Sequence, residues 1–552
     1  MYSLEIDGKR IEYESSDLTY LDAIRSCHPE RAHSAMAVLT QNGVVGLGER
    51  VQHDVHATTL DLTDEEGRRV YERSLRFVFL LAVHQMYPGK RVRFENSMGG
   101  GVYVTLESDV LLSTLAVRRI EAHMRELIDR DLPFEYKDVS QQEALDYFRS
   151  CGWTDKAELL RYHPSQTFRL YECGGLREYF YGAMLPSTGH VRIFALHFLM
   201  PGILLMLPDK DNLSRPAPFV ERPKLTRVLA ETARWSDILG CSNVADLNRM
   251  VMDRSLREFI RVNEALQTKS ISDIADRFAE SGARIMLIAG PSSSGKTTFT
   301  HRMAIELRTM GFKPLLISLD DYYRSRDEIQ PGPDGTIDLE ALEALDVPLF
   351  NEQLICLLQG QTVRLPHFDF TICKSVPGQV DTRIDSSQPI IIEGIHGLND
   401  RLTPDIPNSS KFRVYISALT QLNLDDHNRI RTTDARLIRR LVRDYKFRAS
   451  SVERTFGMWP SVVRGEERNI FCFQEHADAM FNSSLMYEMA ILKNYAAPLL
   501  SDVKPDSPHY TKAQRLLAFL DYFISANVED EVPVNSILRE FIGGCCFYRE
   551  KD

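Results

Sequence analysis

The sequence predicts a multidomain protein in which an N-terminal half of α+β character precedes a doubly wound parallel α/β sheet. Two observations predict this architecture. From residue 284 onward, short apolar runs alternate with helical segments, as in parallel sheets covered by helices; the runs are IMLIAG, PLLISLD, PIIIEGI and FRVYIS. Before that residue, strand-like runs and turn signals alternate with longer helical patterns. The 552 residues are enough for several domains.

Changes in pattern divide the chain into four predicted parts. The first is a small β-rich domain, the second mixes helices and strands, and the third combines a proline-rich linker with a helical bridge. The fourth carries the parallel sheet. Their predicted ranges are 1–62, 63–210, 211–282 and 283–552.

Local signals place elements within the first two parts. Asp7-Gly8 and the Asn-Gly pair 42–43 are predicted hairpin turns. A helix is expected after residue 64, a strand–turn–strand unit around the glycines 99–101, and a second helical region over 110–160. The apolar stretch 193–207 contains a Pro-Gly break and is too short to cross a bilayer, so two strands are expected there.

The composition narrows the classes of partner. The formal net charge of -11 argues against non-specific electrostatic binding to nucleic acid or to an anionic membrane. Binding of a nucleic acid by the N-terminal half remains open. Nine scattered cysteines without a CxxC pair indicate reduced thiols. We expect a cytoplasmic protein without a signal peptide, and self-association remains open.

A phosphate-binding loop follows the apolar run 285–289. The segment GPSSSGKT matches G-x-x-x-x-G-K-[ST] and opens a helical pattern. In this motif small residues let backbone N–H groups surround phosphate oxygens. Lys296 is predicted to reach the β- and γ-phosphates, and the Thr297 hydroxyl to bind Mg²⁺. The residues predicted to bind ATP are Gly290, Ser292, Ser293, Ser294, Gly295, Lys296, Thr297 and Thr298.

Two further apolar strands end in carboxylates. Asp320 follows the run 315–319, and Glu393 ends the run 389–392. Ligands of doubly wound sheets lie beyond the carboxyl ends of the strands, so both side chains should face the phosphate loop. Asp320 is the predicted base for an acceptor hydroxyl, and Glu393 a predicted ligand of Mg²⁺, directly or through water.

Arginines gather on the predicted helix 434–448. Its apolar residues share one helical face, and its arginines lie mainly on the other. Because nearly all these charges are positive in an acidic protein, the pattern favours a phosphate-facing lid over a solvated face. The arginines are Arg436, Arg439, Arg440, Arg443 and Arg448.

Residues 284 to about 510 resemble the uridine kinase and phosphoribulokinase family. GPSSSGKTT, SLDDYY, LPHFDF, IIIEGIHGLN, RLIRRLVRD and HADAMFNSSLMYE carry the resemblance, in the family's order. It implies a five-stranded parallel sheet, a lid near residues 444–470, and Asp320 as general base. It also implies that Arg443 contacts substrate and phosphate and that Arg448 is an arginine of the lid. The residues that it implies contact the nucleoside are Tyr323, Asp338, Phe368 and Asp369.

This chain departs from the uridine kinases at two positions. Phe368 replaces a tyrosine, and Cys373 replaces a histidine that contacts the pyrimidine base. A neutral thiol is a poor substitute for an imidazole hydrogen bond. The departures leave phosphoryl transfer supported and weaken uridine as the acceptor.

The N-terminal half resembles two modules of threonyl-tRNA synthetase. Residues 1–62 resemble its TGS domain, a β-grasp fold, and residues 63–210 its editing domain. The stretches LDLTDEEGRRVYERSL and YECGGLREYFYG carry the second resemblance. Where that domain has HxxxH and CxxxH, this chain has Arg73, Phe77, Cys173 and Arg177, so we expect neither Zn²⁺ nor deacylation. Binding of a nucleotide, RNA or an amino acid stays open beside a scaffold role.

These observations lead to one hypothesis and two alternatives. The hypothesis is a kinase that uses ATP and Mg²⁺ to phosphorylate the 5′-hydroxyl of a nucleoside. The first alternative is a kinase for another hydroxyl compound, such as a sugar phosphate or pantothenate. The second is an RNA-linked regulatory NTPase, which the acceptor-side carboxylates argue against.

Overall fold

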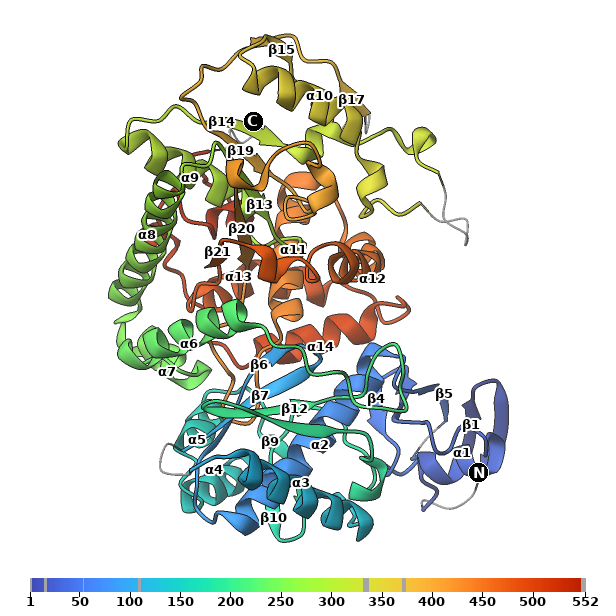
Figure 1. The fold of residues 1–552 in the computed structure, drawn as a ribbon. Helices are drawn as coiled ribbons and strands as arrows, with labels where there is room; N and C mark the ends of the chain where they lie inside the picture. Colours follow the sequence, from blue (N-terminus) through green and yellow to red (C-terminus); the bar gives the residue numbers. More distant parts are fainter. Residues whose placement is uncertain are drawn as a thin grey trace.

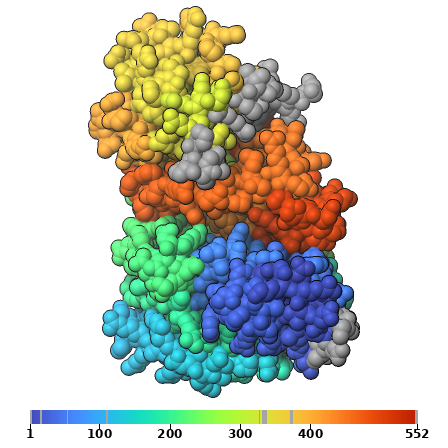
Figure 2. All heavy atoms as spheres, turned by 90° about the vertical axis from the view of Figure 1, so that its right-hand side faces the viewer, coloured from blue at the N-terminus to red at the C-terminus, as the bar shows by residue number. Residues whose placement is uncertain are grey.

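The computed structural model of the chain describes residues 2–13, 17–52, 54–107, 111–330, 337–369 and 374–547. Two halves are stacked along the long axis, with the N-terminal half at the bottom of Figure 1 and the parallel sheet above it. Figure 2 shows the same division from the side, with the first residues of the chain in dark blue on the lower half.

The first residues form a mixed five-stranded sheet in the order β2-β1-β5-β3-β4. β1 and β5 are parallel, and the other neighbours are antiparallel. Both predicted hairpins are present, and the backbone of Asp7-Gly8 has φ values of 47° and 80°. The elements are β1 (Tyr2–Ile6), β2 (Lys9–Tyr13), α1 (Tyr20–Cys27), β3 (Ala37–Thr40), β4 (Gly43–Gly46) and β5 (Val55–Leu60).

The second part packs two antiparallel sheets around α2. One sheet has the order β11-β12-β7-β6 and the other β10-β9-β8. The expected strands within 193–207 are β11 and β12. The elements are α2 (Glu65–Met86), β6 (Val92–Met98), β7 (Gly101–Leu106), α3 (Thr114–Asp129), β8 (Glu135–Ser140), α4 (Gln141–Ser150), α5 (Thr154–Arg161), β9 (Thr167–Cys173), β10 (Leu176–Glu178), β11 (Ala195–Leu199) and β12 (Gly202–Met206).

The helical region expected over 110–160 was wrong in one place, because β8 interrupts it. Five of its six side chains are exposed, so the apolar alternation that identifies a half-buried strand is missing from its sequence. β8 forms because its backbone pairs with β9 along six positions.

The predicted bridge is helical and packs on the second half. α6 (Pro223–Ile238) contacts the edge strand of the parallel sheet, and α7 (Val244–Asp253) leads into α8 (Leu256–Ser281). α8 runs beside α9 at the left of Figure 1. Phe259, Ile260 and Phe278 of α8 are buried in the same core as the sheet.

The second half has the predicted five-stranded parallel sheet, in the order β14-β19-β13-β20-β21. Its strands are β13 (Ile285–Ala289), β14 (Leu315–Ser318), β19 (Ile390–Glu393), β20 (Lys411–Ser417) and β21 (Ala479–Asn482). Short ribbons pair β15 (Val363–Arg364) with β18 (Asp381–Thr382) and β16 (His367–Asp369) with β17 (Lys374–Val376). The helices are α9 (Lys296–Thr309), α10 (Val347–Leu358), α11 (Thr432–Arg448), α12 (Val452–Asn469), α13 (Glu488–Ser501), α14 (Tyr510–Leu520) and α15 (Arg539–Ile542).

Alternate residues of β13 face two different cores, as expected of a sheet covered on both faces. Met286 and Ile288 pack in the core that includes α8, α9, α11 and α13. Ile285 and Leu287 pack in the core that includes α10. Because the five strands are parallel, their carboxyl ends lie at one edge of the sheet, and the loops that carry the polar residues begin there.

Residues 423–431, which precede α11, join the two halves. The backbone N–H of Phe94 donates to the Asp426 carbonyl at 2.8 Å, and Asn423 donates to the Phe94 carbonyl at 2.7 Å. Buried His427 lies 2.6 Å from a carboxylate oxygen of Glu178. The C-terminal half therefore extends a loop into the N-terminal half.

Two buried ion-pair groups strengthen this junction. Asp434, at the start of α11, accepts hydrogen bonds at 2.9–3.1 Å from Arg69 of α2 and from Arg515 of α14. Glu72 of α2 pairs with Arg429 at 3.1 Å and also with Arg431. Because these charges are shared between the halves, α2 and α11 are held in a fixed relation.

Candidate active site

The phosphate loop joins β13 to α9 and requires glycine at both ends. A Cβ at Gly290 would lie 2.1 Å from the Ile416 carbonyl oxygen, and Gly295 has a φ of 80°. The Lys296 ammonium donates to the carbonyl oxygens of Gly290 and Pro291 at 2.9 and 3.2 Å. The lysine is thus held over the loop, where a phosphate can compete for it.

The expected metal ligands lie next to each other. The Thr297 hydroxyl donates to Glu393 Oε1 at 3.2 Å, and the Ser318 hydroxyl donates to the same oxygen at 3.3 Å. Burial and the charge of Asp320 raise the pKa of Glu393 to about 7, against the lowering effect of Lys296. Hydroxyl and carboxylate oxygens are ligands that Mg²⁺ accepts, with phosphate oxygens and waters completing its shell. The residues therefore fit the metal.

Asp320 lies at the same edge of the sheet. Its backbone N–H donates to the Ser318 hydroxyl at 3.3 Å, and Ser318 is in register with Glu393 on the neighbouring strand. Its side chain is exposed. The charge of Asp320 affects the pKa of both Glu393 and Arg448, so all three groups surround one region. An exposed carboxylate beside the phosphate loop can receive a proton from an acceptor hydroxyl.

Tyr323 lies at the centre of an acidic cluster. Burial, followed by the charges of Asp320, Glu340 and Asp338, raises the pKa of its phenol well above the usual value. The rings of Tyr323 and Phe368 meet edge to face with centroids 6.4 Å apart. The predicted contact residues Tyr323, Asp338 and Phe368 therefore lie in one neighbourhood. Asp369 pairs with Lys374 in the β16–β17 ribbon, and Cys373 is outside the described residues.

Two arginines of α11 support the loop from outside. Arg436 forms a bidentate pair with Glu466 of α12 at 2.6 and 2.7 Å, and Glu466 accepts the backbone N–H of Ser292 at 2.8 Å. Arg440 donates to the Ser292 hydroxyl at 3.0 Å. Both side chains are buried, with Arg436 1% exposed and Arg440 7%, so they do not form the solvated face that the sequence pattern also allowed. Direct phosphate binding by either residue stays a prediction.

The last arginines of the helix share one carboxylate. Arg443 pairs with Asp444 at 2.9 Å, and the Arg448 guanidinium lies 3.8 Å from it. The positive charge of Arg443, followed by burial, lowers the pKa of Arg448 to about 10, while Asp320 raises it. Arg448 is therefore near enough to Asp320 for their charges to interact. Contact of Arg443 or Arg448 with a substrate stays a prediction.

Sequence reasoning missed two acids of this site. Glu340 is near Lys296 and Arg440, and its pKa is raised to about 7 by burial and by the charge of Glu466. Glu466 was missed because it contacts Ser292 across 174 residues of chain. Glu340 had a weak signal, since it stands two residues after the predicted contact Asp338.

The residues at the editing motif positions do not form a metal-binding constellation. Phe77 packs against Phe134 with ring centroids 5.3 Å apart, and Arg73 donates to the Ala183 carbonyl. Burial raises the pKa of the Cys173 thiol to about 12. Arg177 lies at the surface and pairs with Glu172 at 2.5 Å. The predicted absence of Zn²⁺ and of deacylation stays a prediction.

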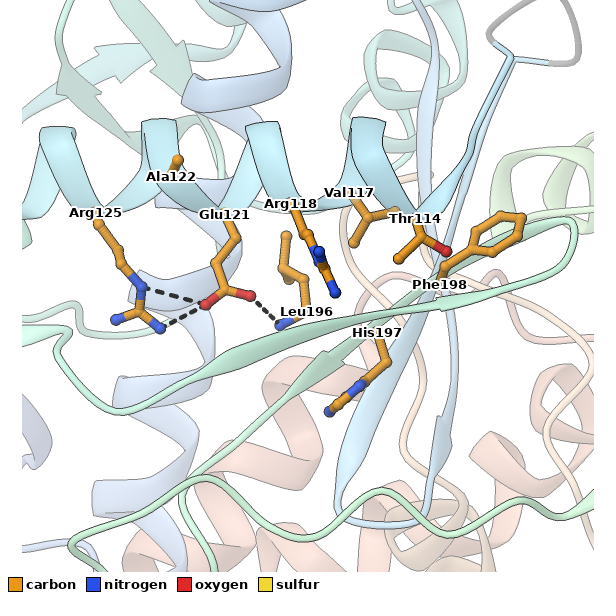
Figure 3. Close-up of a pocket in the computed structure, with 9 residues that line it drawn as sticks. All are labelled: Thr114, Val117, Arg118, Glu121, Ala122, Arg125, Leu196, His197 and Phe198. Carbon is orange, nitrogen blue, oxygen red and sulfur yellow. Dashed lines mark hydrogen bonds and ion pairs between the residues drawn. The ribbon is translucent and has the colours of Figure 1, made fainter.

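A cavity of about 490 Å³ lies in the N-terminal half between α3 and β11. Figure 3 shows Arg118, Glu121 and Arg125 on the helix side and His197 turned away beneath the strand. Glu121 is engaged by Arg125 at 2.6 Å and by the Leu196 backbone N–H at 3.0 Å. The cavity is open and belongs to a different half from the phosphate loop.

The fold and these residues support a P-loop kinase in the C-terminal half. Residues 285–485 match the model of the Phosphoribulokinase / Uridine kinase family, which supports phosphotransferase activity. A solved structure described as a possible uridine kinase of Bacillus stearothermophilus is 18% identical; the alignment covers 39% of this chain and 98% of that one, with a TM-score of 0.27.

The N-terminal half matches threonyl-tRNA synthetases. The threonine–tRNA ligases of Paraburkholderia phytofirmans and Methylococcus capsulatus are each 28% identical to it over 191 residues. The match covers 34% of this chain and 30% of each ligase, so this chain spans less than a third of these relatives. It is consistent with a fused module.

Three features of the described residues complete the site's context. No helix there is long and apolar enough to cross a membrane. Within the same residues, no group of three or more His, Cys, Asp or Glu side chains could hold a metal ion. The cysteines described, which exclude Cys373, are all free thiols, as the sequence predicted.

Proposed function

We propose that the C-terminal half transfers the γ-phosphoryl group of ATP to the 5′-hydroxyl of a nucleoside, with Mg²⁺ held by Thr297 and Glu393. The observation that carries this proposal is the shared edge of Asp320, Glu393 and the phosphate loop. A nucleotide switch has no need of a second, exposed carboxylate near Glu393, whereas a kinase needs one for its acceptor.

In the proposed reaction Asp320 takes the proton of the acceptor hydroxyl, and the oxygen of that hydroxyl bonds to the γ-phosphorus. The bond between that phosphorus and the bridging oxygen breaks, and ADP leaves. Lys296 and the guanidinium groups of Arg443 and Arg448 stabilise the negative charge of the transferring group. Mg²⁺ supplies further neutralisation of the phosphate oxygens when bound.

The acidic cluster favours an uncharged acceptor. Asp320, Asp338 and Glu340 all act on the Tyr323 phenol, so a second phosphate or a carboxylate on the acceptor would be repelled there. Carboxylates are good partners for the vicinal hydroxyls of a ribose, and the Tyr323–Phe368 pair offers an aromatic contact for a base. A nucleoside is therefore preferred over a sugar phosphate or pantothenate.

For the N-terminal half we propose a scaffold role in which TGS-like and editing-like modules support the kinase. Phe77 and Arg73 occupy positions where the editing motif has histidines, and both make structural contacts there. This supports a scaffold role over catalysis. An RNA-linked NTPase is the alternative, and it requires RNA-stimulated hydrolysis without a phosphorylated acceptor.

The test incubates the full chain with ATP, Mg²⁺ and a mixed pool of nucleosides, sugars, sugar phosphates and pantothenate, and identifies products by mass spectrometry. We expect a nucleoside 5′-monophosphate from the wild type and none from Asp320→Asn. The neighbouring Asp321→Asn is unsuitable as a control because Asp321 accepts the Phe368 N–H at 2.9 Å. Asp327→Asn, whose side chain is 73% exposed, is the matched control. Normal turnover by Asp320→Asn contradicts the proposal.

A further inference from the structure

The segment 528–547 had no predicted role, yet it lies against the phosphate loop. Glu540 of α15 accepts a hydrogen bond from the Thr298 hydroxyl at 2.8 Å and from the Thr298 backbone N–H at 3.4 Å. Ile537 packs on Gly295, where a Cβ would lie 2.5 Å from its Cγ2 atom. The C-terminal segment thus forms a wall of the donor side.

Thr298 occupies the third position of α9, which begins at Lys296. The first N–H groups of a helix have no partner within the helix, and in this motif they surround the α- and β-phosphates of a bound nucleotide. The Glu540 carboxylate therefore accepts a hydrogen bond from the Thr298 backbone N–H, which a phosphate oxygen would otherwise accept. We propose that Glu540 is a specificity residue that disfavours a phosphate at Thr298, so the loop discriminates among donors by the charge carried there.

The wall itself is fixed. Ile537, Leu538 and Phe541 have 0% exposure, and the Arg439 guanidinium lies 5.0 Å above the Phe541 ring. Lifting the segment would expose all of these apolar side chains to water, whereas rotating one glutamate side chain exposes none. A nucleoside triphosphate therefore enters by displacing the Glu540 side chain alone, and it bears the repulsion of a nearby carboxylate.

A donor with two phosphates escapes most of this conflict. Its phosphates fill the part of the loop around Lys296 and leave Thr298 to Glu540. A nucleoside triphosphate also places a phosphate at Thr298. The repulsion between that phosphate and Glu540 is large because charges at short range interact strongly in a partly buried site. If Glu540 were only a cap for α9, a neutral acceptor in its place would serve equally well and donor choice would not change.

The experiment measures binding and needs no acceptor. Isothermal titration calorimetry gives Kd for Mg²⁺–imidodiphosphate and for the Mg²⁺ complex of β,γ-imido-ATP, with the full-length wild type and with Glu540→Gln. The glutamine keeps an acceptor oxygen for Thr298 and removes only the charge. Asp530→Asn is the matched control, because Asp530 belongs to the same segment but pairs with Arg257 at 2.9 Å, its side chain 66% exposed.

We expect the ratio of the nucleotide Kd to the imidodiphosphate Kd to fall about tenfold or more in Glu540→Gln and to stay unchanged in Asp530→Asn. An unchanged ratio in Glu540→Gln, with the fold intact by circular dichroism, overturns the inference. Glu540→Ala removes the cap as well as the charge, so we expect the same fall in the ratio together with a lower thermal stability; a lower stability with an unchanged ratio would show that Glu540 is only a cap. The inference rests on the proposed kinase function, but the two can fail separately. An unchanged ratio in Glu540→Gln contradicts the inference and leaves nucleoside phosphorylation standing. Failure of the wild type to bind either analogue contradicts both the inference and the kinase function.

Discussion

Glu72 connects the two halves, and removing its charge should open their junction. The side chain is 3% exposed and lies among Arg76, Arg429 and Arg431. Glu72→Gln preserves the shape of the side chain but leaves the buried guanidinium groups of Arg76 and Arg429, and the partly buried one of Arg431, with one carboxylate fewer.

The size of the effect follows from the distances. At an effective dielectric constant of about 20, a pair of charges about 3 Å apart interacts by roughly 5 kcal/mol. Burying the carboxylate offsets part of this attraction, and breaking such a pair typically costs about 3–5 kcal/mol. Since about 1.4 kcal/mol is a factor of ten, the local opening equilibrium should rise by roughly 10² to 10⁴.

Hydrogen exchange followed by mass spectrometry measures this opening in the segment itself. The backbone N–H of Asp426 donates to a carboxylate oxygen of Asp155 in the N-terminal half at 3.0 Å, so peptides over 423–431 contain an amide that is protected in the closed junction. We expect their exchange to accelerate by about two to four orders of magnitude in Glu72→Gln. Asp530→Asn, which breaks only an exposed pair, should change exchange by less than about fivefold. Unchanged exchange over 423–431 in Glu72→Gln would refute the reasoning.

Three further outcomes follow from the same contacts. Burial would raise the pKa of Glu72 and of Asp434, but the surrounding arginines outweigh burial and hold the pKa of Glu72 below 4.5 and that of Asp434 below 3.8. The stability that these two ion pairs contribute is therefore complete above about pH 5 and is lost as the pH falls further. A urea midpoint that is higher at pH 4 than at pH 7 would contradict this. Gly295→Ala should abolish nucleotide binding in calorimetry, because a side chain at φ of 80° is strained and meets the wall; wild-type affinity would exclude the clash. Glu466→Gln should weaken nucleotide binding by about tenfold or more while the far-ultraviolet circular dichroism is retained, since Arg436 loses its charge partner; equal affinity would show that the loop needs no external support.

The phosphate loop and the acids at the strand ends could be predicted because their signals are local. The apolar run 285–289, the glycine spacing and the following helix lie within one short stretch, and parallel strands bring their carboxyl ends to one edge. Asp320 and Glu393 follow from the same rule. The hairpin at Asp7-Gly8 is likewise a local property of the chain.

The support around the loop could not be predicted because it depends on distant contacts. Glu466 reaches Ser292 across 174 residues and Glu540 reaches Thr298 across 242. Each belongs to a segment whose own sequence looks like an ordinary charged helix or loop. The burial of Arg436 has the same origin, since the helix pattern gives its spacing but not the later helix that covers it.

α11 links the N-terminal half to the phosphate loop. Asp434 in its first turn is held by Arg69 of α2, and Arg436 and Arg440 in the next turns hold Glu466 and Ser292. A helix moves nearly as a rigid body over such a short length, so a change at Asp434 displaces the groups that support the loop. Asp434 is the buried charge of α11 that is shared, since it pairs with Arg515 of the C-terminal half and with Arg69 of the N-terminal half. The structure therefore connects the N-terminal half to the phosphate loop through α11.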